Sequence, residues 1–375
     1  AEQKQMVLNY FGVKENEVVI LEVNNQEERK YLEGVATEAQ LGTRTYSCAY
    51  VQPTSKGNGL NVKTVNLTYV TSSMIASTLT TCGITDANVI AMTPLSGGVS
   101  GTGALTGIMK AFEDATGKPL DEEKKEIASE ELVITGDLGE NIGQDKATGV
   151  INDIKTEIIK NNTQDNIQIA DTINNITNNY NVTLTPEQQE KLENLMTKVS
   201  EQDYDYKEMK DALNSVKDVV NEKLNSIGEK VPTTLINSVK QWFTGIGDWF
   251  ANLFNNESKD LGILETTNDD LLGENAKIDA TDNAAINQTS TEKEQEFFEK
   301  IWNWVTNLFS SNDTTTDSSE NSKSNNNTFE DNFNVDITES SGDSNSSNPS
   351  DLKDDKNTID TNINESNNLE NKNIN

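Results

Sequence analysis

A glycine-rich turn before a predicted helix is the stretch of this sequence best placed to bind an anion. Residues 97–103 read Gly-Gly-Val-Ser-Gly-Thr-Gly, and the following pattern predicts a helix over Thr102–Thr116. The first N–H groups of a helix lack partners within it and can bind a phosphate or carboxylate. The candidate anion-binding residues are Gly98, Ser100, Gly101, Thr102 and Gly103. The stretch lacks the Lys-Ser/Thr ending of a P-loop and the glycine spacing of a dinucleotide site, so a tight packing turn is the alternative.

Histidine is absent from all 375 residues, and this excludes several kinds of chemistry. Neither a Ser-His-Asp or Cys-His nucleophile nor a His-based metal site can form. Carboxylates, Lys, Tyr or a Ser–Lys pair remain as catalytic groups. The only arginines are Arg29 and Arg44, and the formal net charge of −32 opposes binding to nucleic acid. The sequence therefore predicts no catalytic residue, no metal ligand, no cofactor and no nucleic-acid partner.

An aromatic amphipathic helix is predicted twice in the C-terminal part of the chain, within residues 229–256 and 291–310. All four tryptophans lie in these two copies. One apolar face is the signature of a helix that contacts a membrane interface, or that docks on a protein. The candidate contact residues are Trp242, Phe243, Ile246, Trp249, Phe250, Leu253 and Phe254 in the first copy, and Phe297, Phe298, Ile301, Trp304, Val305, Leu308 and Phe309 in the second.

The two cysteines and the N-terminal residues give information on whether the protein is secreted. The chain begins Ala-Glu-Gln without an initiator Met, which is typical either of a mature secreted chain or of a trimmed one. Cys48 and Cys82 form a candidate disulfide if the protein is secreted, and two small buried residues if it is not. No apolar run is long enough to span a membrane.

The N-terminal part alternates between strand and helix patterns. Strands are predicted at Glu17–Val23, Thr43–Gln52, Leu60–Val70 and Ala87–Met92. Helices are predicted between the first two and between the last two, at Asn25–Val35 and Ser72–Thr81. The order β-α-β-β-α-β is that of a ferredoxin-like sandwich, and a small parallel α/β sheet is the alternative. The N-terminal helix or the helix after Gly103 is expected to cover the second sheet face.

Helices follow the strands, and the chain then becomes rich in Asn, Ser, Asp and Thr. The glycines of residues 135–139 predict a turn after a helix that Asp121 caps. The fold class is thus α+β, a ferredoxin-like sandwich followed by a helical extension and a disordered acidic tail. The predicted division is an α+β domain (1–140), a helical extension packed on or beside it (141–228), the first aromatic helix (229–256), an acidic linker (257–290), the second aromatic helix (291–310) and the disordered tail (311–375).

Two stretches carry a resemblance to a known family. The segment TPLSGGVSGTGALTGIMKAFEDATGK and the later DEEKKEIASEELVITGDLGENIG are similar to the signature of the DUF1002 family, the YpuA-like secreted proteins of Gram-positive bacteria. The likeness covers most of the chain from Gln3 to Ile227. It implies a secreted, extracellular or cell-envelope protein, and it implies no activity.

Two functions are therefore compared. The first is a non-catalytic cell-envelope protein that contacts a membrane surface or a partner protein through the aromatic helices. The alternative is an extracellular hydrolase of cell-wall polymer that uses paired carboxylates. A buried carboxylate pair in a pocket next to Ser100 would favour the hydrolase.

Overall fold

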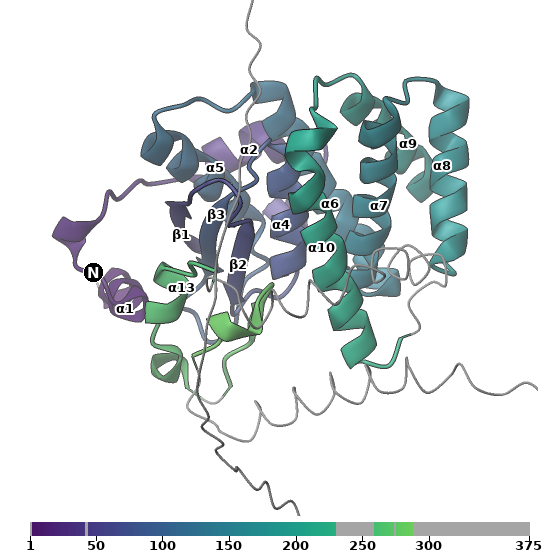
Figure 1. Ribbon diagram of the computed structural model, residues 1–375. Coiled ribbons are helices and arrows are strands. Elements are labelled where there is room, and N and C mark those ends of the chain that lie inside the picture. Colours follow the sequence, from purple (N-terminus) through teal and green to yellow (C-terminus); the bar gives the residue numbers. More distant parts are fainter. Residues whose placement is uncertain (1, 42–43, 230–258, 274, 288–375) are drawn as a thin grey trace, which may run out of the picture. The chain divides into compact units, whose positions relative to one another are not determined.

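A four-stranded mixed sheet organises the described chain (Figure 1), which in this computed structural model comprises residues 2–41, 44–229, 259–273 and 275–287. The strands are β1 (Cys48–Pro53), β2 (Leu60–Val65), β3 (Ala87–Met92) and β4 (Ile278–Ala280), in the spatial order β1-β3-β2-β4. β3 pairs antiparallel with β1 and parallel with β2, whereas β4 pairs antiparallel with β2. The parallel pair requires a crossover, which α4 (Ser72–Thr81) supplies.

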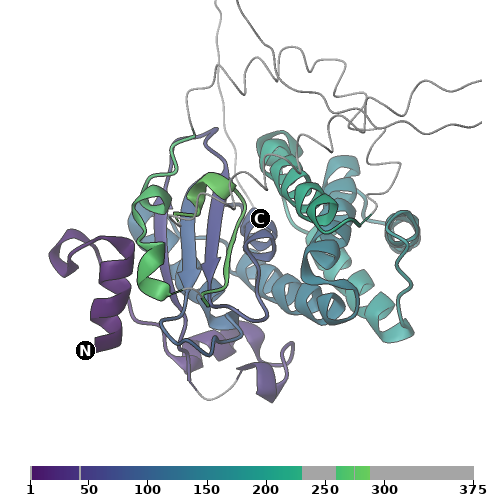
Figure 2. The ribbon, with the colours of Figure 1, turned by 90° about the horizontal axis from the view of Figure 1, so that it is seen from below.

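The two faces of the sheet are covered by different parts of the chain (Figure 2). Alternate residues such as Val62 and Val89 pack against α4 and α5 (Thr102–Thr116), and we call this side the bundle face. Val65 and Ile90 point to the other side, where α1 (Glu2–Phe11) and residues 259–287 cover them. We call residues 259–287 the strap, and this side the strap face. Of the two helices expected to cover the second face, the N-terminal one does so, whereas the helix after Gly103, α5, packs on the bundle face.

Helices after α5 extend the core of the bundle face. Thr71 caps α4, and Asp121, Thr185 and Asp205 cap three later helices through their side chains. Apolar residues at helical spacing then pack these helices against α4 and one another. They are α6 (Glu122–Ile142), α7 (Gln144–Asn161), α8 (Asn166–Asn179), α9 (Pro186–Ser200) and α10 (Tyr206–Ser226). Among the described helices, none is long and apolar enough to cross a membrane.

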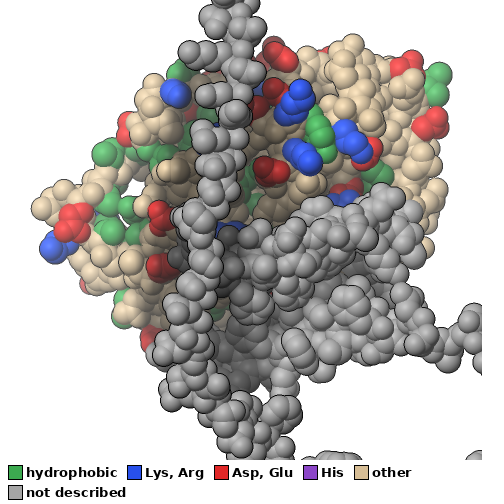
Figure 3. Space-filling view, in the orientation of Figure 1, with side chains coloured by type: hydrophobic (Ala, Val, Ile, Leu, Met, Phe, Trp, Pro, Cys, Tyr) green, Lys and Arg blue, Asp and Glu red, His purple; other side chains and the backbone are tan. Residues whose placement is uncertain are grey.

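The predicted α+β class is confirmed, but the ferredoxin-like topology is not. Its first strand is not formed, β3 lies between β1 and β2 so that these two do not pair as a hairpin, and β2 runs parallel to β3. Residues 18–23 join the 3₁₀ turn η1 (Glu15–Glu17) to α2 (Asn25–Leu32) without pairing to a strand. α1 lies on the strap face, whereas α2 packs against α5 and α6 on the bundle side. The segment must therefore cross from one layer to the other instead of running along the sheet. Gaps separate this part of the chain from the rest in the space-filling view (Figure 3).

Two further expectations need correction. Residues 135–139 do not form a turn, because α6 continues through them to Ile142. The described residues of the predicted acidic linker (257–290) are not an open connection. They form β4, a short helix α13 (Ile263–Thr266) and the 3₁₀ turns η2 (Asp269–Leu272) and η3 (Asn283–Ala285). The predicted tail (311–375) and both aromatic helices lie outside the described residues.

Candidate functional site

A buried ion pair fixes the strap to the sheet. Lys63 of β2 points its ammonium into the strap face, where Nζ lies 2.6 Å and 2.7 Å from the two carboxylate oxygens of Asp269. Thr267 Oγ1 and the carbonyl of Ala285 accept further hydrogen bonds from it, both at 2.8 Å. Tyr10 of α1 donates its phenol proton to Asp269 Oδ1 at 2.9 Å. The side chains of Lys63 and Asp269 are 0% exposed, so α1, the sheet and the strap meet at one closed polar cluster.

The electrostatics of this cluster follow from its burial. Burial lowers the pKa of the Lys63 ammonium, and the hydrogen bonds and charge of Asp269 oppose that shift. Burial, together with the charge of Asp269, raises the pKa of the Tyr10 phenol. A buried pair of this kind adds little net stability compared with apolar residues, but either partner left alone is strongly unfavourable. The pair therefore specifies one position of the strap on the sheet.

A second polar contact joins the strap to the helices. Asp279 of β4 accepts the backbone N–H of Ser72, the first residue of α4, at 2.8 Å. The other oxygen of Asp279 lies 2.6 Å from Lys223 Nζ of α10. Asn283 then donates to Glu222 Oε1, also on α10, at 3.3 Å. The strap thus ties the edge of the sheet to α4 and α10.

These contacts hold the chain on both sides of the first aromatic segment. Glu229, the last described residue before it, pairs with Lys146 of α7 at 3.1 Å. After the segment, the N–H of Asp260 donates to Asn58 Oδ1 at 3.0 Å, and its carbonyl accepts from Asn58 and Asn88, both at 2.9 Å. The strap ends where the N–H of Asn287 donates to Asp269 Oδ2 at 2.7 Å. The chain is therefore fixed to the folded body immediately before and immediately after the first aromatic segment. The chain that leads to the second aromatic segment continues from Asn287, which is also fixed.

The glycine-rich turn has the backbone that its sequence predicts, but a carboxylate of the chain itself lies there. Gly98 and Gly101 have φ of 73° and 95°, which glycine adopts readily. Glu28 of α2, only 3% exposed, accepts from Thr102 Oγ1 at 3.1 Å and from Thr45 Oγ1 at 2.7 Å. A Cβ on Gly103 would lie 3.0 Å from this carboxylate. The geometry favours the packing turn over an external anion site.

A Ser–Lys pair is present in the core, in a setting that favours a structural role. Lys155 of α7 lies 2.8 Å from Glu131 Oε1 of α6, and it donates to Ser77 Oγ at 3.1 Å and Thr81 Oγ1 at 2.9 Å, both on α4. Ser77 also donates to Glu131 at 2.6 Å. The side chains of Lys155 and Glu131 are 0% exposed. A substrate could reach this serine only if three helices separated.

Neither Lys63 nor Lys155 was singled out from the sequence, although a signal exists for both. Lys63 interrupts an apolar strand, Leu-Asn-Val-Lys-Thr-Val, and Lys155 stands among the isoleucines of a buried helix. A lysine inside an apolar run predicts a buried charge, which requires an acidic partner. The partner of Lys63 lies 206 residues further along the chain, so spacing alone cannot identify it.

The candidate disulfide is not formed, because the two cysteines belong to different parts of the core. Cys82 is buried on the bundle face with its sulfur 3.4 Å from Met109 Sδ. Cys48 is half-buried on the strap face, beside Tyr50. Both are free thiols, and burial raises the pKa of each.

We expect the two thiols to resist labelling in the native protein. A raised thiol pKa and burial both lower the concentration of reactive thiolate. With a disulfide-exchange reagent at pH 8, Cys82 should react only as fast as the chain unfolds, and Cys48 slowly. Adding denaturant should release two thiols per chain. Prompt reaction of Cys82 in buffer would contradict the packing seen here.

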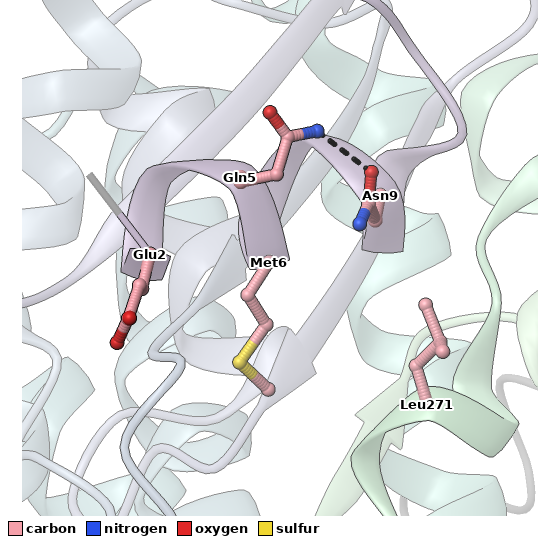
Figure 4. A pocket seen from close by; sticks show the side chains of 5 residues that line it. All are labelled: Glu2, Gln5, Met6, Asn9 and Leu271. Atoms are coloured by element: carbon pink, nitrogen blue, oxygen red, sulfur yellow. Dashed lines mark hydrogen bonds between the residues drawn. The ribbon is translucent and has the colours of Figure 1, made fainter.

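Two hollows lie on the described surface, and the one of about 530 Å³ is lined by Leu21 and by side chains of α5 and α6 that include the ion pair of Lys125 with Glu113 at 3.0 Å. The other hollow, of about 340 Å³, lies between α1 and η2 and is lined by Glu2, Gln5, Met6, Asn9 and Leu271 (Figure 4). Gln5 and Asn9 hydrogen-bond to each other there at 2.9 Å. Within the described ranges, no three His, Cys, Asp or Glu side chains are grouped so as to hold a metal ion. The hollow between α1 and η2 therefore has no nucleophile beside a base in its lining, and its two amide side chains pair with each other.

These features define an α+β protein in which buried ion pairs join the sheet to the strap and the helices to one another. The chain belongs to the DUF1002 family, a family of proteins of unknown function, whose model matches residues 1–216. It is 35% identical over 252 residues to the uncharacterised protein YpuA of Bacillus subtilis (strain 168), an alignment that covers 67% of this chain and 85% of YpuA. No solved structure matches the chain. The family match includes both segments that carry the resemblance in the sequence.

Proposed function

We propose that this chain is a non-catalytic, secreted binding protein of the cell envelope. Its folded body would position the two aromatic segments, which contact a membrane surface or a partner protein. The observation that carries the proposal is the strap. It is held by a fully buried ion pair and by Asp279, and it fixes the chain between the two aromatic segments, at the end of the first and before the start of the second. Two apolar contact segments on one body would bind an extended surface more tightly than either segment alone.

The hydrolase alternative is not favoured by the same structure. Ser100 shares a hydrogen bond of 3.3 Å with Thr102, and the carboxylate beside them is the single buried Glu28. Asp203 and Asp205 are exposed, and Asp205 caps α10. Neither place holds the facing carboxylate pair that glycosidic hydrolysis requires.

Vesicle binding by the full-length chain tests the membrane contact. All four tryptophans, at 242, 249, 302 and 304, lie in the aromatic segments, so tryptophan fluorescence reports on those segments alone. We expect a blue shift and co-sedimentation with phosphatidylcholine vesicles, and weaker binding when phosphatidylglycerol is included, because a chain of charge −32 is repelled by an anionic surface.

The matched variants stay full length, because truncation before the strap would uncover Lys63. Replacing the four tryptophans with alanine should abolish sedimentation. Replacing the exposed Ile167 and Leu271 with alanine removes apolar surface from the folded body and should change nothing. If the unmodified chain neither sediments nor shifts its fluorescence, the membrane contact is wrong, and the aromatic segments should then be used as bait for a partner protein.

A further inference from the structure

The segment that joins α1 to α2 is an apolar strand sequence without a strand partner. It reads Glu-Val-Val-Ile-Leu-Glu-Val from Glu17 to Val23, rich in the β-branched residues that favour strands. Its central side chains are exposed to different degrees, with fractions of 75% for Val19, 42% for Ile20 and 36% for Leu21, and Leu21 also lines a hollow beside α5. Three consecutive exposed apolar residues are unusual in a chain of such high net charge.

The backbone of this segment is also unpaired. From Val19 to Val23, the hydrogen bonds of the described structure include a single one to the main chain, from Lys110 Nζ to the carbonyl of Glu22 at 2.7 Å. The N–H and C=O groups of the intervening residues are therefore free to pair with another strand. An unpaired extended edge with apolar side chains is the usual template for strand addition.

We propose that a second copy of this chain pairs with Val18–Glu22 as an antiparallel strand, with Ile20 facing Ile20 across a two-fold axis. An interface of this kind is self-complementary: if Val19 of one copy contacts Leu21 of the other, then Leu21 of the first copy contacts Val19 of the second. The dimer is a further property of the fold and does not depend on the aromatic segments.

The register follows from the order of charged and apolar residues. With Ile20 opposite itself, Val19 meets Leu21 and Val18 meets Glu22, so the three exposed apolar residues all gain apolar partners. A slip by one residue in one direction places Glu17 opposite Glu22, which brings like charges together. A slip in the other direction places Val19 opposite Glu22. The centred register is thus the one that satisfies the apolar residues without charge repulsion.

The architecture favours a second copy over the sheet of the same chain. α1 is held on the strap face by Tyr10, and α2 begins at a capping box in which Asn24 accepts from the backbone of Gln26 and Glu27. The segment between them is therefore fixed at both ends while it crosses between layers. It could lie along β1 only if one of these helices left its place. A second copy can approach from the solvent side without moving either helix.

The strength of the dimer is limited by its size and charge. A ribbon of about five residues per copy buries less than the roughly 1,200 Å² of a stable interface, and an isolated two-stranded ribbon is marginal. Two chains of charge −32 also repel each other, and salt screens that repulsion. We therefore expect a weak dimer, with a dissociation constant on the order of tens of micromolar, that salt strengthens.

Symmetric disulfide trapping tests the pairing directly. Directly opposite residues of an antiparallel pair have Cα atoms about 4.5–5.5 Å apart, within the range that a disulfide spans. In a full-length Cys48→Ser background, Ile20→Cys should form covalent dimers at least about tenfold faster than Ile167→Cys, because only the first meets its own mate. Ile167 is the matched control, since it is 72% exposed on α8. Val19→Cys mixed with Leu21→Cys should cross-link faster than Val19→Cys alone.

Light scattering over a concentration series gives the second measurement. The unmodified chain should approach the dimer mass at high concentration, and more so at 0.5 M salt than at 0.05 M. Ile20→Asp should remain monomeric with an unchanged melting temperature, because the side chain lies on the surface. Equal cross-linking of Ile20→Cys and Ile167→Cys would overturn the proposal. Protection of residues 19–23 from hydrogen exchange at all concentrations would also overturn it, because the partner strand would then belong to the same chain.

Discussion

Replacing Asp269 with asparagine is expected to lower the free energy of unfolding by about 3–5 kcal/mol at pH 7. Asparagine keeps the shape of the side chain but removes the charge that faces Lys63 at 2.6 Å. The ammonium then has no counter-ion inside the sheet, and its hydrogen bonds to Thr267 and Ala285 cannot replace one. Urea unfolding, followed by circular dichroism, gives the difference.

The pH dependence of this variant distinguishes a buried charge from a lost contact. Without Asp269, burial holds the pKa of Lys63 in the folded chain below its unfolded value. The unfolded chain then binds the extra proton at neutral pH, so stability rises with pH and the deficit shrinks toward the unfolded pKa. Within the pH range that separates the folded and unfolded pKa of Lys63, the deficit should fall with rising pH by at most about 1.4 kcal/mol per pH unit. The unmodified chain should show a smaller slope in the same direction, because Asp269 opposes the lowering of the Lys63 pKa.

Two control variants separate the ion pair from general damage. Lys63→Met combined with Asp269→Asn removes both charges and keeps an acceptor beside Tyr10 and Asn287, so its stability should lie closer to that of the unmodified chain than that of Asp269→Asn alone. Glu208→Ala breaks the exposed pair with Lys56 and should cost less than about 1 kcal/mol. A loss below 1 kcal/mol for Asp269→Asn would show that this pair does not hold the strap.

The parts of the fold that depend on local pattern could be predicted from the sequence. Thr185-Pro186 with Gln188 indicates a capping box, and α9 begins there with that box formed. The apolar spacing of α10 likewise predicts its buried residues, such as Val216 and Val220. Such signals are informative because a helix cap and an apolar helix face each depend on residues within one or two helical turns of the sequence.

The strap and the topology could not be predicted, because both depend on distant contacts. Residues 259–287 are acidic, which is typical of a linker, although 11 of the 29 are apolar. They are ordered by Lys63, and the three residues of β4 are too few to show a strand pattern. The segment 17–23 shows the reverse case. Its strand pattern is clear, but α1 and α2 fix its ends in different layers.

The most informative wrong prediction concerns a glycine of α6. Gly136 was expected to mark a turn, but it lies within the helix, where the ring of Tyr69 passes directly over its backbone. A Cβ at Gly136 would lie 2.0 Å from Tyr69 Cζ, far inside contact distance. The glycine is therefore present because of a close approach, which only the tertiary structure reveals.

Gly136→Ala is accordingly expected to lower the free energy of unfolding by about 2–4 kcal/mol, although alanine is the better helix former. Tyr69 cannot move aside at little cost. Its hydroxyl donates to the carbonyl of Val133 at 3.0 Å and lies 2.9 Å from Asp137 Oδ1, and Gln40 donates to it at 3.1 Å. Chemical denaturation of the purified variant measures the loss.

Gly107→Ala provides the opposite result in the same chain. Gly107 also lies inside a helix, α5, but the nearest atom to its added Cβ would be Val23 Cγ2 at an ordinary 3.9 Å. That substitution should stabilise the protein by about 0.5–1 kcal/mol, because alanine restricts the unfolded chain without a clash. Tyr69→Ala supplies the coupling test: in that background Gly136→Ala should no longer destabilise. If both glycine variants instead gained stability, the ring of Tyr69 would not lie against α6, and residues 135–139 would not be held as the structure has them.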